Sequence, residues 1–247
     1  PAATPTASPQ TASQPEPPAD AATAEAAPER LSASAVGATN GLQWLMAGFE
    51  MLKGNTLEWI AASALLIAVD VVISMVPVIG PPLSALAYPM LLGGLMLGAH
   101  REYETGRLDV ACVFEGVRTQ PFGLGLLGIV FWALAALPFA VLTGILTLFD
   151  TVPSTLLLVA IALILSMPML GVLILATPLV AISESTFSDA LKLAFAGTLR
   201  NIPAIVLYTI GSIVLLAGGV MLLGLGIVVT LPIVLAGGYA AFRDVYG

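Results

Sequence analysis

Six long apolar runs occupy most of the sequence after residue 56. They are Leu57–Val78, Leu83–Ala99, Phe122–Phe149, Ser154–Ile182, Pro203–Leu222 and Gly226–Phe242. A helix needs about 17–25 predominantly apolar residues to cross the ~30 Å hydrocarbon core of a membrane. The runs do not alternate apolar and polar residues, as a transmembrane β-strand would. They predict an all-α polytopic membrane protein in which six transmembrane helices form three hairpins.

The composition excludes several classes of protein. Hydrophobic residues make up 58% of the chain and charged residues 9%, against roughly 45–50% and 25% in soluble domains. The net charge of −7 argues against a nucleic-acid partner, because phosphate contacts need clustered Lys and Arg. A single Cys and a single His exclude an intrachain disulfide and lead us to expect neither a bound metal nor a cofactor. No common catalytic motif is present, so we do not expect an enzyme.

Residues 1–40 differ in kind from residues 41–247. They are rich in Pro, Ala, Thr, Ser and Glu, with no aromatic residue, so they cannot bury enough apolar area to offset the cost of ordering the chain. We expect a disordered, acidic, Pro/Ala-rich tail ahead of a six-helix membrane domain. Because the sequence begins with Pro1, we also expect that the native start lies upstream.

The basic residues indicate an orientation. None of the eight falls in the three short turns that join the runs in pairs. They are Arg30, Lys53, Arg101, Arg107, Arg118, Lys192, Arg200 and Arg243. Lys and Arg are retained on the cytoplasmic side of membrane proteins. Both termini and the two long loops are therefore predicted to be cytoplasmic. We expect the acidic residues of the first long loop, Glu102 among them, to be solvated.

A short segment precedes each predicted hairpin, at residues 41–55, 109–121 and 188–203. Each starts beside a helix-capping residue (Asn40, Asp109, Ser188) and carries apolar residues at helical spacing. The apolar residues are Leu42, Leu45, Met46, Phe49 and Leu52 in the first, Val110, Val113, Phe114 and Val117 in the second, and Leu191, Phe195 and Leu199 in the third. These segments predict amphipathic helices in the cytoplasmic interface.

The same pattern predicts lipid contacts and an internal repeat. Each segment ends near a base, at Lys53, Arg118 or Arg200, and the closing helices of the first and third hairpins end in Arg101 and Arg243. These five bases are expected to contact anionic lipid headgroups. The architecture then consists of three pseudo-repeats, at about 41–105, 106–187 and 188–247.

One ionisable residue, Asp70, lies well inside an apolar run. Ser63 and Ser74 share its helix face, and the hydroxyls expected at a similar depth belong to Thr143, Ser166, Ser212 and Thr230. Two interpretations stay open: a structural or water-exposed polar group, or a proton, cation or substrate site. Gly94 and Gly98 form a small-xxx-small pair that permits close helix approach, within one chain or between two copies.

Three stretches carry a resemblance to a known family. GLQWLMAGFEMLKGNTLEW at residues 41–59, FSDALKLAFAGTLRN at residues 187–201 and YAAFRD at residues 239–244 resemble bacterial six-helix inner-membrane proteins of unassigned activity. That group is similar to the YciC-type proteins and to the membrane domain of some glycerophosphodiester phosphodiesterases. The resemblance implies a bacterial inner membrane. It implies no phosphodiesterase activity, because no catalytic domain is attached.

These observations favour a noncatalytic integral membrane protein with an accessory, scaffold or lipid-organising role. Membrane lipids are the expected partners, and a membrane-protein partner or a homo-oligomer stays open. The alternative is a transporter or channel for a small solute, a lipid or a proton-coupled substrate that uses Asp70.

Overall fold

The computed structural model describes residues 31–149, 155–183, 185–221 and 226–247. It describes their side chains except at 134–135, 137–139, 145–146, 148–149 and 155–168. The compact unit of the chain begins at Ser32. The predicted disorder of the tail therefore falls mostly on residues 1–30, which lie outside the described part.

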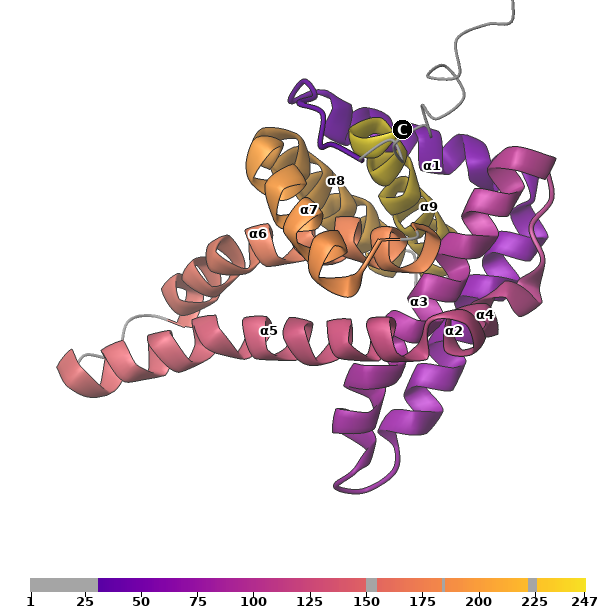
Figure 1. Cartoon of the computed structure of the whole chain (residues 1–247). Coiled ribbons are helices and arrows are strands. Elements are labelled where there is room, and N and C mark those ends of the chain that lie inside the picture. The colour runs from indigo at the N-terminus through magenta and orange to yellow at the C-terminus, as the bar shows by residue number, and fades with distance from the viewer. Residues whose placement is uncertain (1–30, 150–154, 184, 222–225) are drawn as a thin grey trace, which may run out of the picture. The chain divides into compact units, whose positions relative to one another are not determined.

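The described residues form helices and no strands, which confirms the all-α prediction (Figure 1). The α-helices are α1 (Asn40–Gly54), α2 (Thr56–Ser74), α3 (Gly80–Thr105), α4 (Glu115–Thr119), α5 (Pro121–Phe149), α6 (Thr155–Ile182), α7 (Phe187–Arg200), α8 (Ile202–Met221) and α9 (Ile227–Tyr246). A 3-10 helix, η2 (Val110–Phe114), precedes α4.

Four of these helices, α2, α3, α8 and α9, are long and apolar enough to cross a membrane. This finding supports a membrane protein and matches four of the predicted runs. Helices α5 and α6 cover the other two runs. The apolar parts of α5 and α6 in which side chains are described, Pro121–Ala133 and Met169–Ile182, are each shorter than a span.

The connection between α2 and α3 has clear local causes. Pro81 and Pro82 occupy the first turn of α3, where a missing N–H costs no helical hydrogen bond. Gly80 is required because a Cβ there would lie 2.6 Å from the Ile73 carbonyl oxygen. Val78 adopts a φ of 69°, an uncommon backbone for a β-branched residue. The turn is therefore tight enough to hold the two helices side by side.

Glycines set two of the closest helix contacts. A Cβ on Gly48 in α1 would overlap the backbone of α9 at Ile233 and Gly237. A Cβ on Gly116 in α4 would overlap the backbone of α3 at Met90 and Gly94. In each receiving helix the two residues are four apart, and the first directly follows a proline. The segments that precede the first and second hairpins therefore dock in the same register, α1 on α9 and α4 on α3.

The predicted pair Gly94 and Gly98 packs within this chain. A Cβ on Gly94 would overlap the carbonyl oxygens of Cys112 and Val113, and a Cβ on Gly98 would overlap the Cys112 sulfur. The absence of side chains at both glycines therefore leaves room for η2, which packs against α3.

The segments predicted to precede the hairpins differ from the prediction in two respects. The first and third are not capped by the predicted residues, and the second begins as another type of helix. The segment after Asp109 begins as the 3-10 helix η2, because the Asp109 carboxylate accepts a hydrogen bond from the Ala111 N–H at 3.0 Å and closes a tight first turn. Helix α7 is capped by Thr186 rather than Ser188. Asn40 does not cap α1, because its side chain is bound to Asp244 instead.

Candidate functional site

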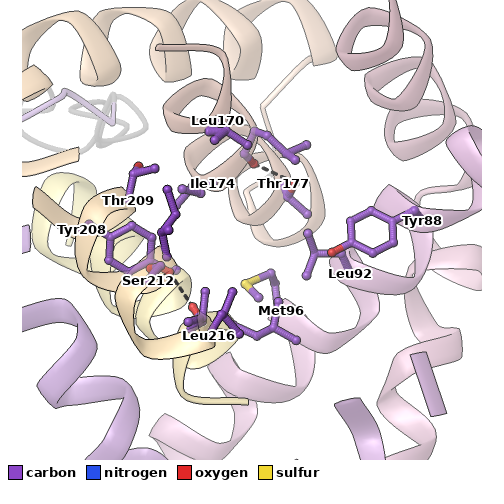
Figure 2. Close-up of a pocket in the computed structure, with 15 residues that line it drawn as sticks. Tyr88, Leu92, Met96, Leu170, Ile174, Thr177, Tyr208, Thr209, Ser212 and Leu216 are labelled. Carbon is purple, nitrogen blue, oxygen red and sulfur yellow. Dashed lines mark hydrogen bonds between the residues drawn. The ribbon is translucent and has the colours of Figure 1, made fainter. Parts of the chain in front are cut away.

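A cavity of about 270 Å³ lies between α3, α6, α8 and α9 (Figure 2). Its lining is mostly aliphatic and contains no charged residue. The labelled residues around it are Tyr88, Leu92 and Met96 from α3, Leu170, Ile174 and Thr177 from α6, and Tyr208, Thr209, Ser212 and Leu216 from α8. The cavity is partly open, and its lining residue Ile213 is 47% exposed.

The hydroxyls in the lining differ in what they can offer a ligand. Tyr208 donates to the Val234 carbonyl oxygen at 2.5 Å. Thr177 and Thr209 each donate at 2.8 Å to a carbonyl one turn back in their own helix. The Ser212 hydroxyl is buried beside the Tyr208 hydroxyl, which itself donates to Val234, and no hydrogen bond of good geometry holds Ser212 among the described residues. The cavity can therefore hold a neutral, largely apolar molecule and give it one hydrogen bond.

Asp70 is not among the residues that line this cavity. The Ser84 hydroxyl donates to Asp70 Oδ1 at 2.5 Å, and Asp70 is half-buried. Asp70 is four residues from the end of α2 and Ser84 is in the first turns of α3, so the pair sits beside the tight turn. Sequence reasoning missed Ser84, although residues 70 and 84 are equidistant from residue 77 in the middle of the turn.

The other predicted intramembrane candidates are dispersed. Ser63 is buried and has no partner among the described residues, whereas Ser74 is exposed and donates to the Asp70 carbonyl oxygen. Thr230 is packed against Gly219. Thr143 is exposed on α5, and the Ser166 side chain is outside the described part. Of the six candidates whose side chains the structure describes, only Ser212 lines the cavity.

A buried carboxylate that sequence reasoning missed lies at the end of α3. Glu102 is 7% exposed, which corrects its expected place in a solvated loop. It accepts hydrogen bonds from Asn55 Nδ2 at 2.6 Å and from Trp59 Nε1 at 2.7 Å. Asn55 donates also to the Gly106 carbonyl oxygen. Glu102 thus joins the end of α3 to the start of α2.

A second carboxylate makes the same kind of contact at the end of α9. Asp244 Oδ2 accepts hydrogen bonds from Asn40 Nδ2 and Trp44 Nε1, both at 2.8 Å. In both cases an Asn and the Trp four residues later hold an acid that follows an Arg. The sequence therefore carried a recognisable signal for these two contacts: an Asn four residues before a Trp, and an Arg directly before an acidic residue.

The predicted headgroup-binding bases have different surroundings. Arg101 pairs with Glu115 through two contacts of 2.6 and 3.0 Å, and Arg243 lies over the Tyr103 ring at 3.3 Å. Lys53 contacts Glu50 at 2.8 Å on the exposed side of α1. Arg200 donates to the Ala33 carbonyl oxygen at 3.0 Å. Arg118 is exposed on α4.

The segment before α1 is held at the same end of the helices. Asn201 accepts from the Val36 N–H at 2.8 Å and donates to the Ser34 carbonyl oxygen at 2.9 Å. Ser34 N–H in turn donates to the Val245 carbonyl oxygen at 2.9 Å. The segment before α1, the start of α8 and the end of α9 are therefore joined by hydrogen bonds through Ser34 and Asn201.

The single thiol is chemically passive. Cys112 is fully buried, and burial, aided by the negative charges of Glu115 and Asp109, raises the pKa of its thiol to about 12. Within the described residues, no group of three or more His, Cys, Asp or Glu could hold a metal ion.

No family model, curated protein or solved structure matches this chain.

Proposed function

We propose that this chain is an integral protein of the bacterial inner membrane that acts without catalysis and organises anionic lipid at the cytoplasmic face. In this proposal six helices span the membrane as three hairpins, both termini are cytoplasmic, and α1, the η2–α4 segment and α7 lie in the interface. The proposal includes the threefold repeat and the resemblance to the bacterial six-helix family. The surface of α1 carries the argument.

Helix α1 presents three different faces around its axis. The buried face, which packs across α8 and α9, contains Gly41, Trp44, Gly48 and Leu52. The exposed surface divides into an apolar strip of Leu42, Met46 and Phe49, and a polar strip of Gln43 and Glu50. At about 100° per residue these strips are neighbours on the outer surface. A helix between protein, acyl chains and water would need these three faces.

The apolar strip of α1 is not explained by packing within the chain. Met46 is 69% exposed, and Phe49 and Leu42 are also exposed. Lys53 follows at the end of this strip, with its ammonium over the Phe49 ring, where the negative end of the helix dipole favours a cation. An apolar strip that ends in a base suits burial below the headgroups.

Helix α7 repeats this division. Its buried face is made of small residues, Ala190, Ala194 and Gly197. Phe195 and Leu199 are exposed, and Arg200 ends the helix. In α7 these small residues let the helix approach the domain closely while Phe195 and Leu199 remain outside. In α1 glycines allow the same close approach, although Trp44 and Leu52 are buried there as well. The two helices would therefore offer two similar lipid-facing surfaces at the same end of the domain.

The level of α1 along the spans is consistent with an interface. Gly237, which α1 contacts, is two residues from Tyr239, and Tyr239 OH lies 2.9 Å from His100 Nδ1 near the end of α3. His100 is 20 residues past Gly80, so the distance along α3 is about 30 Å. That length is close to the hydrocarbon thickness, which supports an interfacial position for α1.

Site-specific quenching in vesicles tests this placement. Met46→Cys and Gln43→Cys, each in a Cys112→Ala background, carry an environment-sensitive dye on the two outer strips of α1. We expect acyl-chain nitroxides to quench the Met46 reporter strongly and aqueous iodide to quench the Gln43 reporter. Equal iodide quenching of both reporters would contradict the interfacial position of α1.

A further inference from the structure

We infer that the cavity between α3, α6, α8 and α9 binds the acyl chain of a neutral membrane amphiphile, with the Ser212 hydroxyl as its hydrogen-bond partner. This inference goes beyond the proposed lipid organisation by α1 and α7 and requires only that the helices span a membrane. It concerns a separate, internal site.

The size of the cavity selects a thin ligand. Apolar cavities of about 150 Å³ bind benzene, so about 270 Å³ accommodates a substantially larger apolar group. A helix with its side chains is about 10–12 Å across. The same volume is small for such a helix, of which it would hold only about two residues, so the occupant that fits is a thin chain whose remainder lies outside the opening.

The position of the cavity along α8 favours a lipid as the ligand. Ser212 is ten residues past the start of α8 and nine from the end of that 20-residue helix, so it lies near the middle, about 14–15 Å from each end. At that depth in a bilayer the surrounding solvent is acyl chain. The half-exposed lining residue Ile213 lies on the outer side of α8, so a chain can enter laterally.

The chemistry of the lining selects a neutral polar group. With no cation in the lining, a carboxylate or a phosphate would be buried without a counter-charge, at a large cost. Ser212 is 93% buried, and within the described residues its hydroxyl has only the Tyr208 hydroxyl beside it, without a hydrogen bond of good geometry. A buried hydroxyl without a partner is unfavourable, and an alcohol or ester carbonyl oxygen on the ligand would satisfy it.

Photolabelling of the full-length chain in phosphatidylcholine–phosphatidylglycerol vesicles tests the site. The probe is hexadecanol with a diazirine in its chain, and the competitor is unlabelled hexadecanol. We expect saturable labelling that maps to cavity residues of α3, α8 or α9. Hexadecanoate at pH 8 should compete at least about tenfold less well. Labelling that is not saturable, or that maps only outside the cavity, would overturn the inference.

Two leucine substitutions provide the matched comparison. A Cβ on Gly238 would have only ordinary contacts, 3.7 Å from Ile174 and Tyr208, so Gly238→Leu fills the cavity from α9. Gly218→Leu adds the same side chain to α8 where no atom lies within 4 Å of a Cβ. We expect at least a tenfold loss of labelling in the first and no change in the second. Equal labelling of the two would contradict the site.

Two further variants keep the test decisive. Ser212→Leu fills the cavity from the other side and replaces Gly238→Leu if that variant does not fold. Ser212→Ala keeps the space and removes the hydroxyl, so we expect hexadecanol to bind about fivefold more weakly, as for one lost hydrogen bond. Unchanged binding in Ser212→Ala would remove the role of the hydroxyl. The Met46 and Gln43 reporters on α1 respond independently, so failure here leaves the proposed function standing.

Discussion

Trp59 Nε1 donates a 2.7 Å hydrogen bond to Glu102 Oε2, and the two side chains are 0% and 7% exposed. This bond joins the start of α2 to the end of α3, at the end of the hairpin opposite to its tight turn. The second carboxylate oxygen accepts from Asn55. Both oxygens are thus used by neutral donors, which makes the carboxylate a clamp between the two helices.

Loss of this clamp should destabilise the protein measurably. Glu102→Leu leaves the buried Trp59 N–H without an acceptor, at about 1–3 kcal/mol, and removes one of the two acceptors of the half-buried Asn55 amide, at about 1 kcal/mol. We therefore expect the free energy of unfolding to fall by about 2–4 kcal/mol. Glu102→Gln keeps one acceptor and should lose less. Unfolding in detergent micelles measures both. Glu104→Leu, one half-turn away on the exposed side, is the control and should change stability by less than about 0.5 kcal/mol.

The close glycine contacts predict a steric penalty. Gly48→Ala and Gly116→Ala would each press a methyl group against the backbone of a neighbouring helix, so we expect each to lower the free energy of unfolding by about 1–3 kcal/mol. Gly218→Ala, at an open position of α8, should be neutral or stabilising by up to about 1 kcal/mol. Equal effects at the three positions would show that helix propensity, rather than close approach, explains them.

The Cys112 thiol should be inert in the folded protein. Its pKa of about 12 leaves almost no thiolate at pH 8, and thiolate is the reactive form. We expect maleimide to label Cys112 at least about 100-fold more slowly in native than in unfolded protein. Rapid labelling of the native protein would contradict its burial.

The same shift has a consequence for stability at high pH. Because the pKa is raised in the folded state from an ordinary value of about 9, the unfolded chain loses this proton first. The contribution of Cys112 to stability is therefore present below about pH 9 and is lost as the pH rises toward 12. Cys112→Ala should flatten this part of the stability–pH curve, and an unchanged curve would show that the thiol does not contribute.

The Asp70–Ser84 pair should act as a hairpin contact. A double-mutant cycle with Asp70→Ala and Ser84→Ala should give a coupling energy of about 0.5–1.5 kcal/mol, the range for hydrogen bonds within membranes and proteins. Additive effects would mean that the bond contributes nothing. Asp70→Asn retains an acceptor oxygen but removes the charge, so a change in proton-coupled flux in liposomes would instead favour the transporter alternative.

Local features of the sequence predicted the helices well. The run Leu57–Val78 corresponds to α2 at Thr56–Ser74, and Pro203–Leu222 corresponds to α8 at Ile202–Met221. These boundaries follow from apolar length and from Pro, Gly and polar residues that are adjacent in the chain. Asp109 was likewise recognised as a cap, although it caps a 3-10 turn.

The tertiary partners could not be predicted in the same way. Glu102 resembles its neighbours in an acidic stretch, and only the positions of Asn55 and Trp59 distinguish it. The apolar residues of α1 were assigned to one face, but Leu52 is buried while Met46 is exposed, because Gly48 rather than the large side chains sets the docking face. The cavity arises from side chains of four helices and has no signature in any one of them.

The preference for anionic lipid tests the central claim most directly. In mixed vesicles, electron paramagnetic resonance of spin-labelled lipids gives the association of phosphatidylglycerol with the protein relative to phosphatidylcholine. Each base near the surface attracts anionic lipid by about 1 kcal/mol. We therefore expect a preference of about three- to fivefold that falls toward one in the triple variant Lys53→Gln, Arg118→Gln, Arg200→Gln. Arg101→Gln should change it little, because the wild-type guanidinium is held by two contacts to the half-buried Glu115. Lys53, in contrast, shares a single contact with the more exposed Glu50. No preference in the wild-type chain, or the same preference in the triple variant, would contradict the account.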